Sequence, residues 1–191
     1  MDREVDSIHI VVEVSNVVKI LVAYHSDTGN TEKIAKGIYE EASKSNEAQL
    51  RKISEIRPED LSNYDLVFLG GPCQANDLAF PVKRLLSAIP MSPRFKVAGF
   101  FTHMSPVSEK HSGHEKCVAS FQNISKEKRI EFEGLYDCQG MPAPKLSEMM
   151  RKNVNVSEDQ WKRSLEETRK HPSAEDIRNA KGFAAKVIAK I

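Results

Sequence analysis

The sequence predicts an α/β protein with three layers, in which a doubly wound, five-stranded parallel sheet lies between helices. Two observations predict this fold. Short apolar runs rich in β-branched residues alternate with helical patterns along the chain, and the loops between them carry small and hydroxyl residues. Parallel strands joined by right-handed helical crossovers are buried on both faces. In such a sheet a ligand binds beyond the carboxyl ends of the strands, where the winding direction reverses.

Composition narrows the classes of function. The chain has 191 residues, 40% of them hydrophobic, which suffices for one domain with a single core. Its net charge is +1, with acidic and basic residues interspersed, so nothing favours nucleic-acid binding. The longest apolar runs are too short to span a membrane, the first residues do not resemble a secretion signal, and three cysteines give no disulfide framework. We therefore expect a cytoplasmic protein that binds neither nucleic acid nor membranes.

The first strand is expected at Val18–Tyr24, and a turn follows at Ser26–Thr31. A helix then begins, because Ile34, Ile38 and Ala42 fall on one helical stripe. The turn therefore lies at a helix N-terminus, where unpaired N–H groups and the helix dipole favour an anion such as phosphate.

The composition of this turn predicts a bound phosphate monoester. Ser26, Thr28 and Thr31 add hydroxyl donors, and Gly29 permits a tight or left-handed turn. The turn lacks the glycine spacing of a dinucleotide loop and the Gly-Lys pair of a nucleoside-triphosphate loop. It also contains no Lys or Arg, so neutral donors would hold a phosphate that stays bound and is not transferred. From these residues alone, the alternative is an ordinary capped helix start.

Four more strands are predicted, the first of them from a short alternating segment and the other three from apolar runs. Three loops should leave from one edge of the sheet: the first turn, Gly71–Asp77 and Thr102–Gly113. The predicted strand ranges are Gln49–Ile53, Tyr64–Gly70, Phe95–Phe101 and Arg129–Cys138.

Three further helices are predicted from apolar residues at helical spacing. The last, Ser173–Ile191, is the clearest, because Pro172 precedes a capping box of Ser173 and Asp176. Another covers Glu115–Lys126. The third is marked by the apolar residues Phe80, Val82, Leu85, Leu86 and Ile89.

Two segments do not belong to the alternating pattern. Residues 1–16 form an N-terminal extension with a strand-like run, which would have to pair on a sheet edge or against a second subunit. The domain itself is expected at residues 17–191 with an insertion at about 139–171. Within the insertion, Ser157–Lys170 has a helical pattern, and Trp161 on it is expected to pack the insertion onto the body. The insertion is interrupted by Pro142, Pro144 and Asn155.

Two motifs resemble those of the flavodoxin-like FMN-binding proteins. The turn Ser26–Thr31 resembles their phosphate loop, Ser/Thr-x-Thr-Gly-x-Thr, and Tyr64–Pro72 resembles their third strand, which ends in Gly and Pro before a loop that contacts the flavin. The closing helix is more weakly similar at Glu175–Ala184. The resemblance covers about residues 17–138 and 172–191, and it implies a flavodoxin-like sheet with strand order 2-1-3-4-5 and a non-covalently bound FMN.

The resemblance also implies which residues bind FMN. The first loop would hold the phosphate, with the carboxylate of Asp27 pointing away because two anions in contact repel each other. The second and third loops would line the two sides of the isoalloxazine, where Cys73 is interpreted as a small residue that lets the ring approach. The implied residues are Ser26, Thr28, Gly29, Asn30 and Thr31 for the phosphate, Gly71, Pro72, Cys73, Gln74, Ala75 and Asn76 for one side of the ring, and Thr102, His103 and Met104 for the other.

The chain departs from the family pattern in three ways. Neither ring-lining loop contains an aromatic residue, Ala75 or Asn76 stands where electron carriers often have glycine, and the charge is near neutral where carriers are usually acidic.

The leading expectation is an electron-transfer flavoprotein that serves a redox partner protein. The alternative is an NAD(P)H-dependent FMN reductase of quinones or similar small acceptors, because an uncovered ring leaves room for a hydride donor. A flavin-free binding module that associates through its N-terminal strand, as in a homo-oligomer, is the third hypothesis.

One further pattern has the residue types of a metal site. His111, His114 and Cys117 would share one face of a helix. Gly113 lies among them and no second ligand pair is near, so a polar loop leading to a buried cysteine is the favoured interpretation and no metal ligand is predicted. His103, just past the fourth strand, is instead expected near the flavin or substrate, and His111 shares its loop.

Overall fold

The computed structural model describes residues 17–105, 114–153 and 156–191. Five parallel strands form the sheet in the order β2-β1-β3-β5-β6, and β4 pairs antiparallel with β3 outside this path. The structure thus confirms the predicted α/β fold and its strand order. The strand-like N-terminal extension and most of the predicted third loop lie outside the described residues. The strands are β1 Lys19–Tyr24, β2 Glu47–Lys52, β3 Leu66–Gln74, β4 Asp77–Leu78, β5 Lys96–His103 and β6 Phe132–Gln139.

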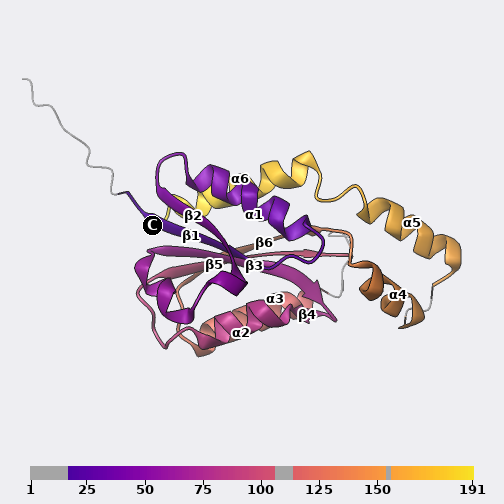
Figure 1. Ribbon diagram of the computed structural model, residues 1–191, viewed down its shortest axis with the longest axis horizontal. Helices are drawn as coiled ribbons and strands as arrows, with labels where there is room; N and C mark the ends of the chain where they lie inside the picture. The colour runs from indigo at the N-terminus through magenta and orange to yellow at the C-terminus, as the bar shows by residue number, and fades with distance from the viewer. Residues whose placement is uncertain (1–16, 106–113, 154–155) are drawn as a thin grey trace, which may run out of the picture.

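Helices cover both faces of the sheet. Figure 1 shows α1 and α6 on one face and α2 and α3 on the other, while α4 and α5 extend beyond the carboxyl ends of the strands. No helix in the described ranges is long and apolar enough to cross a bilayer. The helices are α1 Asn30–Ala42, α2 Phe80–Ala88, α3 Glu115–Glu127, α4 Pro144–Asn153, α5 Glu158–Thr168 and α6 Ala174–Ile188, with short 3-10 turns at Ile53–Glu55 and Pro58–Asn63.

The sheet separates two apolar cores. Alternate side chains of a strand point to opposite faces, so Ile20 and Val22 of β1 pack in the core under α1 and α6. Their neighbours Leu21 and Ala23 pack in the other core. This two-sided burial explains why the strands appear in the sequence as continuous apolar runs.

Two strands run further than the sequence predicted. β5 reaches His103, and β3 continues beside it, with Pro72 opposite Thr102. The predicted loop Gly71–Asp77 is therefore wrong in part, because its first half is strand and its second half turns into β4. Ala75 and Asn76 form the turn with left-handed φ values of 51° and 60°, as a two-residue hairpin turn requires. The longer strands bring these residues to a fixed position at the sheet edge.

The insertion contains two helices instead of the single one predicted. Pro144 does not interrupt it but begins α4, because proline fits the first position of a helix, where no N–H partner is needed. The helical pattern predicted for Ser157–Lys170 is confirmed as α5. Trp161 of α5 is buried and lines a shallow hollow together with Ser147 and Arg151 of α4. The two insertion helices therefore lie against each other at this tryptophan.

Candidate functional site

A pocket of about 360 Å³ opens at the carboxyl ends of β1, β3 and β5. Its walls are the turn after β1, the β3–β4 hairpin, the end of β5 and the insertion helix α4. This is the sheet edge at which the sequence placed a ligand. The predicted site residues that line it are Thr28, Thr31, Pro72, Cys73, Gln74, Ala75, Asn76, Thr102, His103 and Met104.

The other four predicted site residues do not line the pocket but shape its walls. Ser26 accepts a hydrogen bond at its Oγ from the N–H of Gly29, at 3.1 Å. Asn30 is buried and directs its side-chain amide at the insertion. Gly71 lies inside the sheet, where an added Cβ would stand 2.4 Å from a methyl carbon of Val82. Gly71 therefore allows α2 to approach the sheet, and it does not face the pocket.

The helix α1 begins without a side-chain cap. Its N-cap is Gly29, which has a left-handed φ of 85° and no side chain to offer. Apart from Gly29 itself and the residues next to it in the chain, no described heavy atom lies within 4 Å of a Cβ built at Gly29. The first N–H groups of a helix have no partner within the helix, and they carry the positive end of its dipole. This end of α1 therefore fits an anionic group such as phosphate.

The start of the insertion lies against the first turn. The carbonyl oxygen of Met141 accepts hydrogen bonds from Thr28 Oγ1 at 3.2 Å and from Asn30 Nδ2 at 2.8 Å. Beneath them, the hydroxyl oxygens of Thr31 and Thr102 lie 2.9 Å apart in a buried hydrogen bond. These bonds hold the first turn, the end of β5 and the insertion in one arrangement.

The carboxylate of Asp27 is held at the mouth of the pocket. Gln74 donates to its Oδ2 at 2.7 Å. His25 Nε2 lies 3.2 Å from its Oδ1. Asp27 thus links the first turn to the β3–β4 hairpin.

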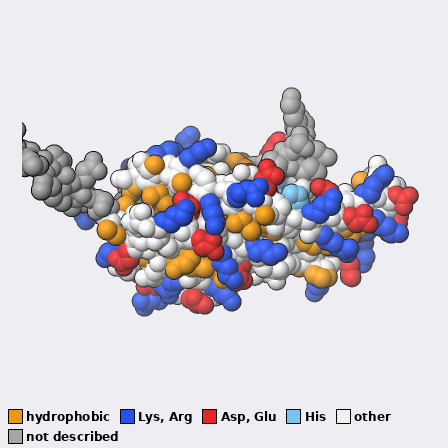
Figure 2. All heavy atoms as spheres, turned by 90° about the horizontal axis from the view of Figure 1, so that it is seen from above, with side chains coloured by type: hydrophobic (Ala, Val, Ile, Leu, Met, Phe, Trp, Pro, Cys, Tyr) orange, Lys and Arg blue, Asp and Glu red, His pale blue; other side chains and the backbone are white. Residues whose placement is uncertain are grey.

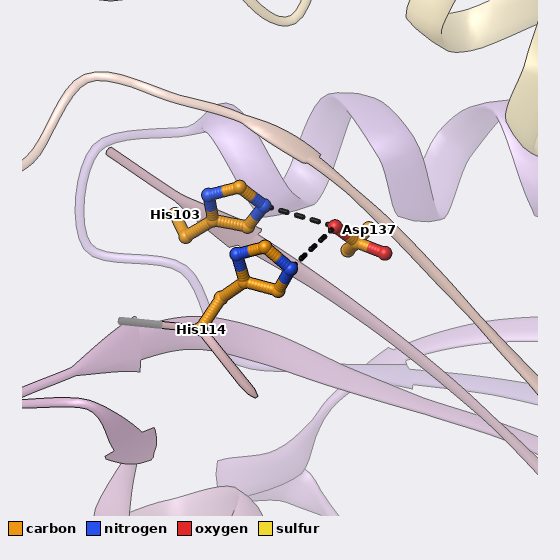
Figure 3. Close-up of side chains that lie close together, drawn as sticks. All are labelled: His103, His114 and Asp137. Atoms are coloured by element: carbon orange, nitrogen blue, oxygen red, sulfur yellow. Dashed lines mark hydrogen bonds and ion pairs between the residues drawn. The ribbon is translucent and has the colours of Figure 1, made fainter. Parts of the chain in front are cut away.

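Three side chains far apart in the sequence meet at the inner wall of the pocket. His103 at the end of β5 lies with its Nε2 3.0 Å from Asp137 Oδ2 on β6, and His114 at the start of α3 lies with its Nε2 3.8 Å from the same oxygen. The two imidazole rings are stacked, with centroids 4.3 Å apart and planes 13° from parallel. Figure 3 shows both rings with one edge turned toward Asp137. His103 is only 4% exposed, and its Nδ1 has no hydrogen-bond partner among the described residues.

The charge state of this cluster follows from its surroundings. Burial, together with the neighbouring His103, lowers the pKa of His114, and Asp137 opposes this shift only in part. His114 is therefore neutral near pH 7, and Asp137 lies beside one edge of both rings (Figure 3).

The pocket thiol has a buried neighbour. Cys73 lines the pocket, and a hydrogen bond with it, together with burial, raises the pKa of the Cys117 thiol far above its usual value. Cys117 therefore stays protonated and inert. The predicted buried state of Cys117 is confirmed, while His111 lies outside the described residues.

Sequence reasoning missed the wall that the insertion contributes. A stripe at positions i, i+3, i+4 and i+7 was the signal that could have found it, because such spacing puts residues on one face of a helix. The pocket-facing residues of the insertion that were not predicted include Met141, Pro142, Leu146, Met149, Met150 and Asn153.

A family model described as a flavodoxin domain matches residues 21–185. The chain belongs to the flavodoxin domain family. It is 33% identical over 184 residues to the flavodoxin-like domain-containing protein BilS of Clostridioides difficile, covering 90% of this chain and 97% of that protein. Flavodoxin 2 of Bacillus cereus shares the fold with a TM-score of 0.61 at 24% identity, over 91% of this chain and 99% of that one. A flavodoxin of Streptococcus pneumoniae TIGR4 gives 0.60 at 13% identity, with coverage of 91% and 99%.

Membership of the flavodoxin domain family makes the protein a flavodoxin-type flavoprotein, and a flavin is the cofactor that this fold implies. The residues of this structure fit such a group. The uncapped N-terminus of α1 suits an anionic end, and the adjoining pocket walls of Pro72, Met104 and Leu146 suit a flat apolar ring.

Proposed function

We propose that the protein binds FMN in this pocket and transfers electrons to or from a redox partner protein. The observation that carries the proposal is the uncapped N-terminus of α1, which opens beside a pocket at the switch point of a doubly wound sheet. Neutral donors surround it, so the phosphate would be held as a dianion by N–H groups and by the hydroxyl of Thr31 while that oxygen accepts from Thr102. The Thr28 hydroxyl would exchange its bond to the Met141 carbonyl for one to the phosphate.

Bound FMN supplies the redox chemistry, and the protein supplies position and electrostatics. The β3–β4 hairpin presents Gln74, Ala75 and Asn76 to the pocket on a turn whose left-handed residues fix the direction of its backbone groups. The side chains of Leu146 and Met150 on α4 add apolar surface to the opposite wall. The polarity and the hydrogen bonds around a bound flavin set its redox potential.

The phosphate contact gives the sharpest test. We expect the double variant Thr28→Val/Thr31→Val to bind FMN on the order of 100-fold more weakly, because each hydrogen bond to a charged group contributes about 1.5–3 kcal/mol. Riboflavin, which lacks the phosphate, should lose far less. The measurement is quenching of flavin fluorescence on titration with flavin-free protein.

A matched control is Thr168→Val, which makes the same change on α5, where Thr168 bonds to the carbonyl of Ser164. It should bind both flavins as the unmodified protein does. Equal losses for FMN and riboflavin in the double variant would contradict the assigned phosphate site.

A second function is favoured by one observation. None of the described residues that line the pocket is Phe, Tyr or Trp, so no aromatic side chain from them covers the ring and a small acceptor can reach it. This supports an NAD(P)H-dependent reductase of quinones or similar acceptors.

Rapid bleaching of bound FMN by NADH or NADPH with turnover of a quinone would establish the reductase. Reduction by a partner protein alone would establish the carrier. Colourless protein that takes up no FMN would leave a binding module.

The surface charge bears on how a redox partner docks. Figure 2 shows basic and acidic side chains intermingled on the face that it displays, and the net charge of the whole chain is +1. Long-range steering needs a field of one sign. We therefore expect the rate of electron transfer to a partner to depend only weakly on salt concentration.

A further inference from the structure

We propose that His103, His114 and Asp137 form a binding site for a divalent transition-metal ion, with Zn²⁺ as the first candidate. These residues come from β5, the start of α3 and β6, so the site exists only in the folded chain. It differs from the helix-face pattern of His111, His114 and Cys117 that the sequence suggested, because Asp137 is the side chain that meets His114.

The spacing of the three ligand atoms fits a metal ion. Bonds of about 2.0–2.1 Å in a tetrahedral arrangement place neighbouring ligand atoms about 3.3 Å apart. The Nε2 atoms of His103 and His114 lie 3.0 Å and 3.8 Å from Asp137 Oδ2, values on either side of that separation. One ligand atom from each of the three residues lies within 4.8 Å of the others. The two imidazole rings are stacked with planes 13° from parallel, so one ring must rotate before both nitrogens can point at the same ion.

The ligand set also selects the class of ion. Two imidazole nitrogens and one carboxylate oxygen bind zinc and other first-row transition metals, whereas Mg²⁺ and Ca²⁺ prefer oxygen ligands. Both ring edges point at the same carboxylate in Figure 3. A dication between them would offset the carboxylate charge at a place where His103 is almost fully buried.

Three protein ligands leave at least one coordination position free. His103 and His114 both line the pocket, so the free position would face it. An ion there could hold a water molecule or an oxygen atom of a small acceptor. None of the three ligands belongs to the first turn, so the metal site is separate from the proposed phosphate contacts, although His103 is also among the residues expected to line the flavin ring.

The test is metal binding by flavin-free protein without an affinity tag, after treatment with a chelator. Zn²⁺ is titrated against a coloured indicator, and Co²⁺ is added separately as a spectroscopic probe. We expect one ion per chain, with visible Co²⁺ bands and no cobalt–thiolate band in the near ultraviolet. Asp137→Asn and His114→Gln should each weaken Zn²⁺ binding on the order of 100-fold, since even indirect partners of metal ligands are worth 10–100-fold.

The control is His25→Gln. His25 also faces an aspartate, with its Nε2 3.2 Å from Asp27. Among the described residues, however, no third His, Cys, Asp or Glu lies close enough to complete a metal site with this pair. Its Zn²⁺ affinity should equal that of the unmodified protein.

Several outcomes would overturn the proposal. It fails if the unmodified protein binds Zn²⁺ no more tightly than Asp137→Asn and His114→Gln, if His25→Gln loses as much affinity, or if Co²⁺ shows a thiolate band. Circular dichroism of each variant shows whether a loss of Zn²⁺ binding comes from misfolding. FMN titration of each variant shows whether the proposed flavin binding fails separately from metal binding. Should Asp137→Asn not fold, His114→Gln decides alone, because that side chain is only partly buried at the start of α3.

Discussion

The helices α1 and α6 lie together on one face of the sheet, yet they begin in opposite ways. α1 begins at Gly29 with no side-chain cap. α6 begins with a complete capping box, in which Ser173 Oγ accepts from the N–H of Asp176 at 3.2 Å and Asp176 Oδ2 accepts from the N–H of Ser173 at 2.6 Å. His171 Nδ1 lies 2.6 Å from the same carboxylate oxygen. The helix that faces the pocket leaves its N-terminal donors available, whereas the helix that does not face it satisfies them internally.

This contrast supports the proposed phosphate site at the start of α1. Gly at an N-cap costs only about a few tenths of a kcal/mol relative to Ser or Asp, so the start of α1 stays open to a ligand at a small cost in stability. The two helices therefore predict opposite responses: changes at the start of α1 should act on ligand affinity, and changes at the start of α6 should act on folding.

The largest expected effect comes from giving α1 an anionic cap. Ser26→Asp keeps an acceptor for the N–H of Gly29 and adds a negative charge to the site of the phosphate. We expect FMN affinity to fall about 100-fold or more through charge repulsion, while the free energy of unfolding rises by about 0.5 kcal/mol. Flavin titration and urea unfolding measure the two effects. Ser26→Asn, the neutral variant of the same shape, should keep most of the FMN affinity.

The matching change on α6 should lower stability and leave the ligand untouched. Asp176→Asn removes the charge that accepts from Ser173 and His171, and we expect the free energy of unfolding to fall by about 2 kcal/mol. FMN affinity should stay unchanged. Glu175→Gln, an exposed carboxylate in the same first turn, is the control and should cost less than about 0.5 kcal/mol. An equal loss in both variants would mean that the dipole, not the capping box, stabilises this end.

The same carboxylate predicts a pH dependence. Burial raises the pKa of Asp176, but hydrogen bonds from Ser173 and His171 outweigh it, so the folded-state pKa lies below the ordinary value. A depressed pKa gives stability that is present above the unfolded-state pKa of about 3.9 and is lost as the pH falls through the folded-state value. The stability difference between the protein and Asp176→Asn should thus shrink as the pH falls below about 4. A difference that persisted at pH 2 would contradict this assignment.

The smallest expected effects come from a glycine in each helix. Gly182 of α6 is exposed and an added Cβ would meet nothing within 4 Å, so Gly182→Ala should raise the free energy of unfolding by about 0.5–1 kcal/mol. At Gly37 of α1 the same Cβ would stand 3.1 Å from a methyl carbon of Ile177. Gly37→Ala should lose that gain, because α1 and α6 must separate slightly. Thermal unfolding of the two variants would show whether α1 and α6 pack closely at Gly37.

The parts of the fold that local chemistry determines were predictable from the sequence. The hydroxyl-rich turn after β1 and the capping box at Ser173 are short motifs, and the structure confirms the helix start at each. The lengths of β3 and β5 were not predictable, because each strand continues only where the other supplies a partner, as at Pro72 and Thr102. Pro144 was misinterpreted because proline can both interrupt a helix and begin one.

The candidate site divides in the same way. The turn Ser26–Thr31 could be found because its residue pattern lies within one stretch of chain, although its partners Met141 and Thr102 come from elsewhere. The meeting of His103 and His114 with Asp137 could not, because it depends on the register of β5 and β6 and on where α3 begins. Asp137 also lies in a strand, and nothing in its neighbourhood marks it as different from other strand carboxylates.

Gly140 joins the sheet to the insertion through a very narrow space. A Cβ there would stand 3.1 Å from Asn30 Cβ and 3.2 Å from Thr102 Cβ, so a larger residue would push the first turn and β5 apart. Beyond that joint, α4 supplies a pocket wall that does not belong to the sheet. We therefore expect substitutions on α4 that leave Gly140 in place to alter which small molecules enter, while the sheet and the first turn stay as they are.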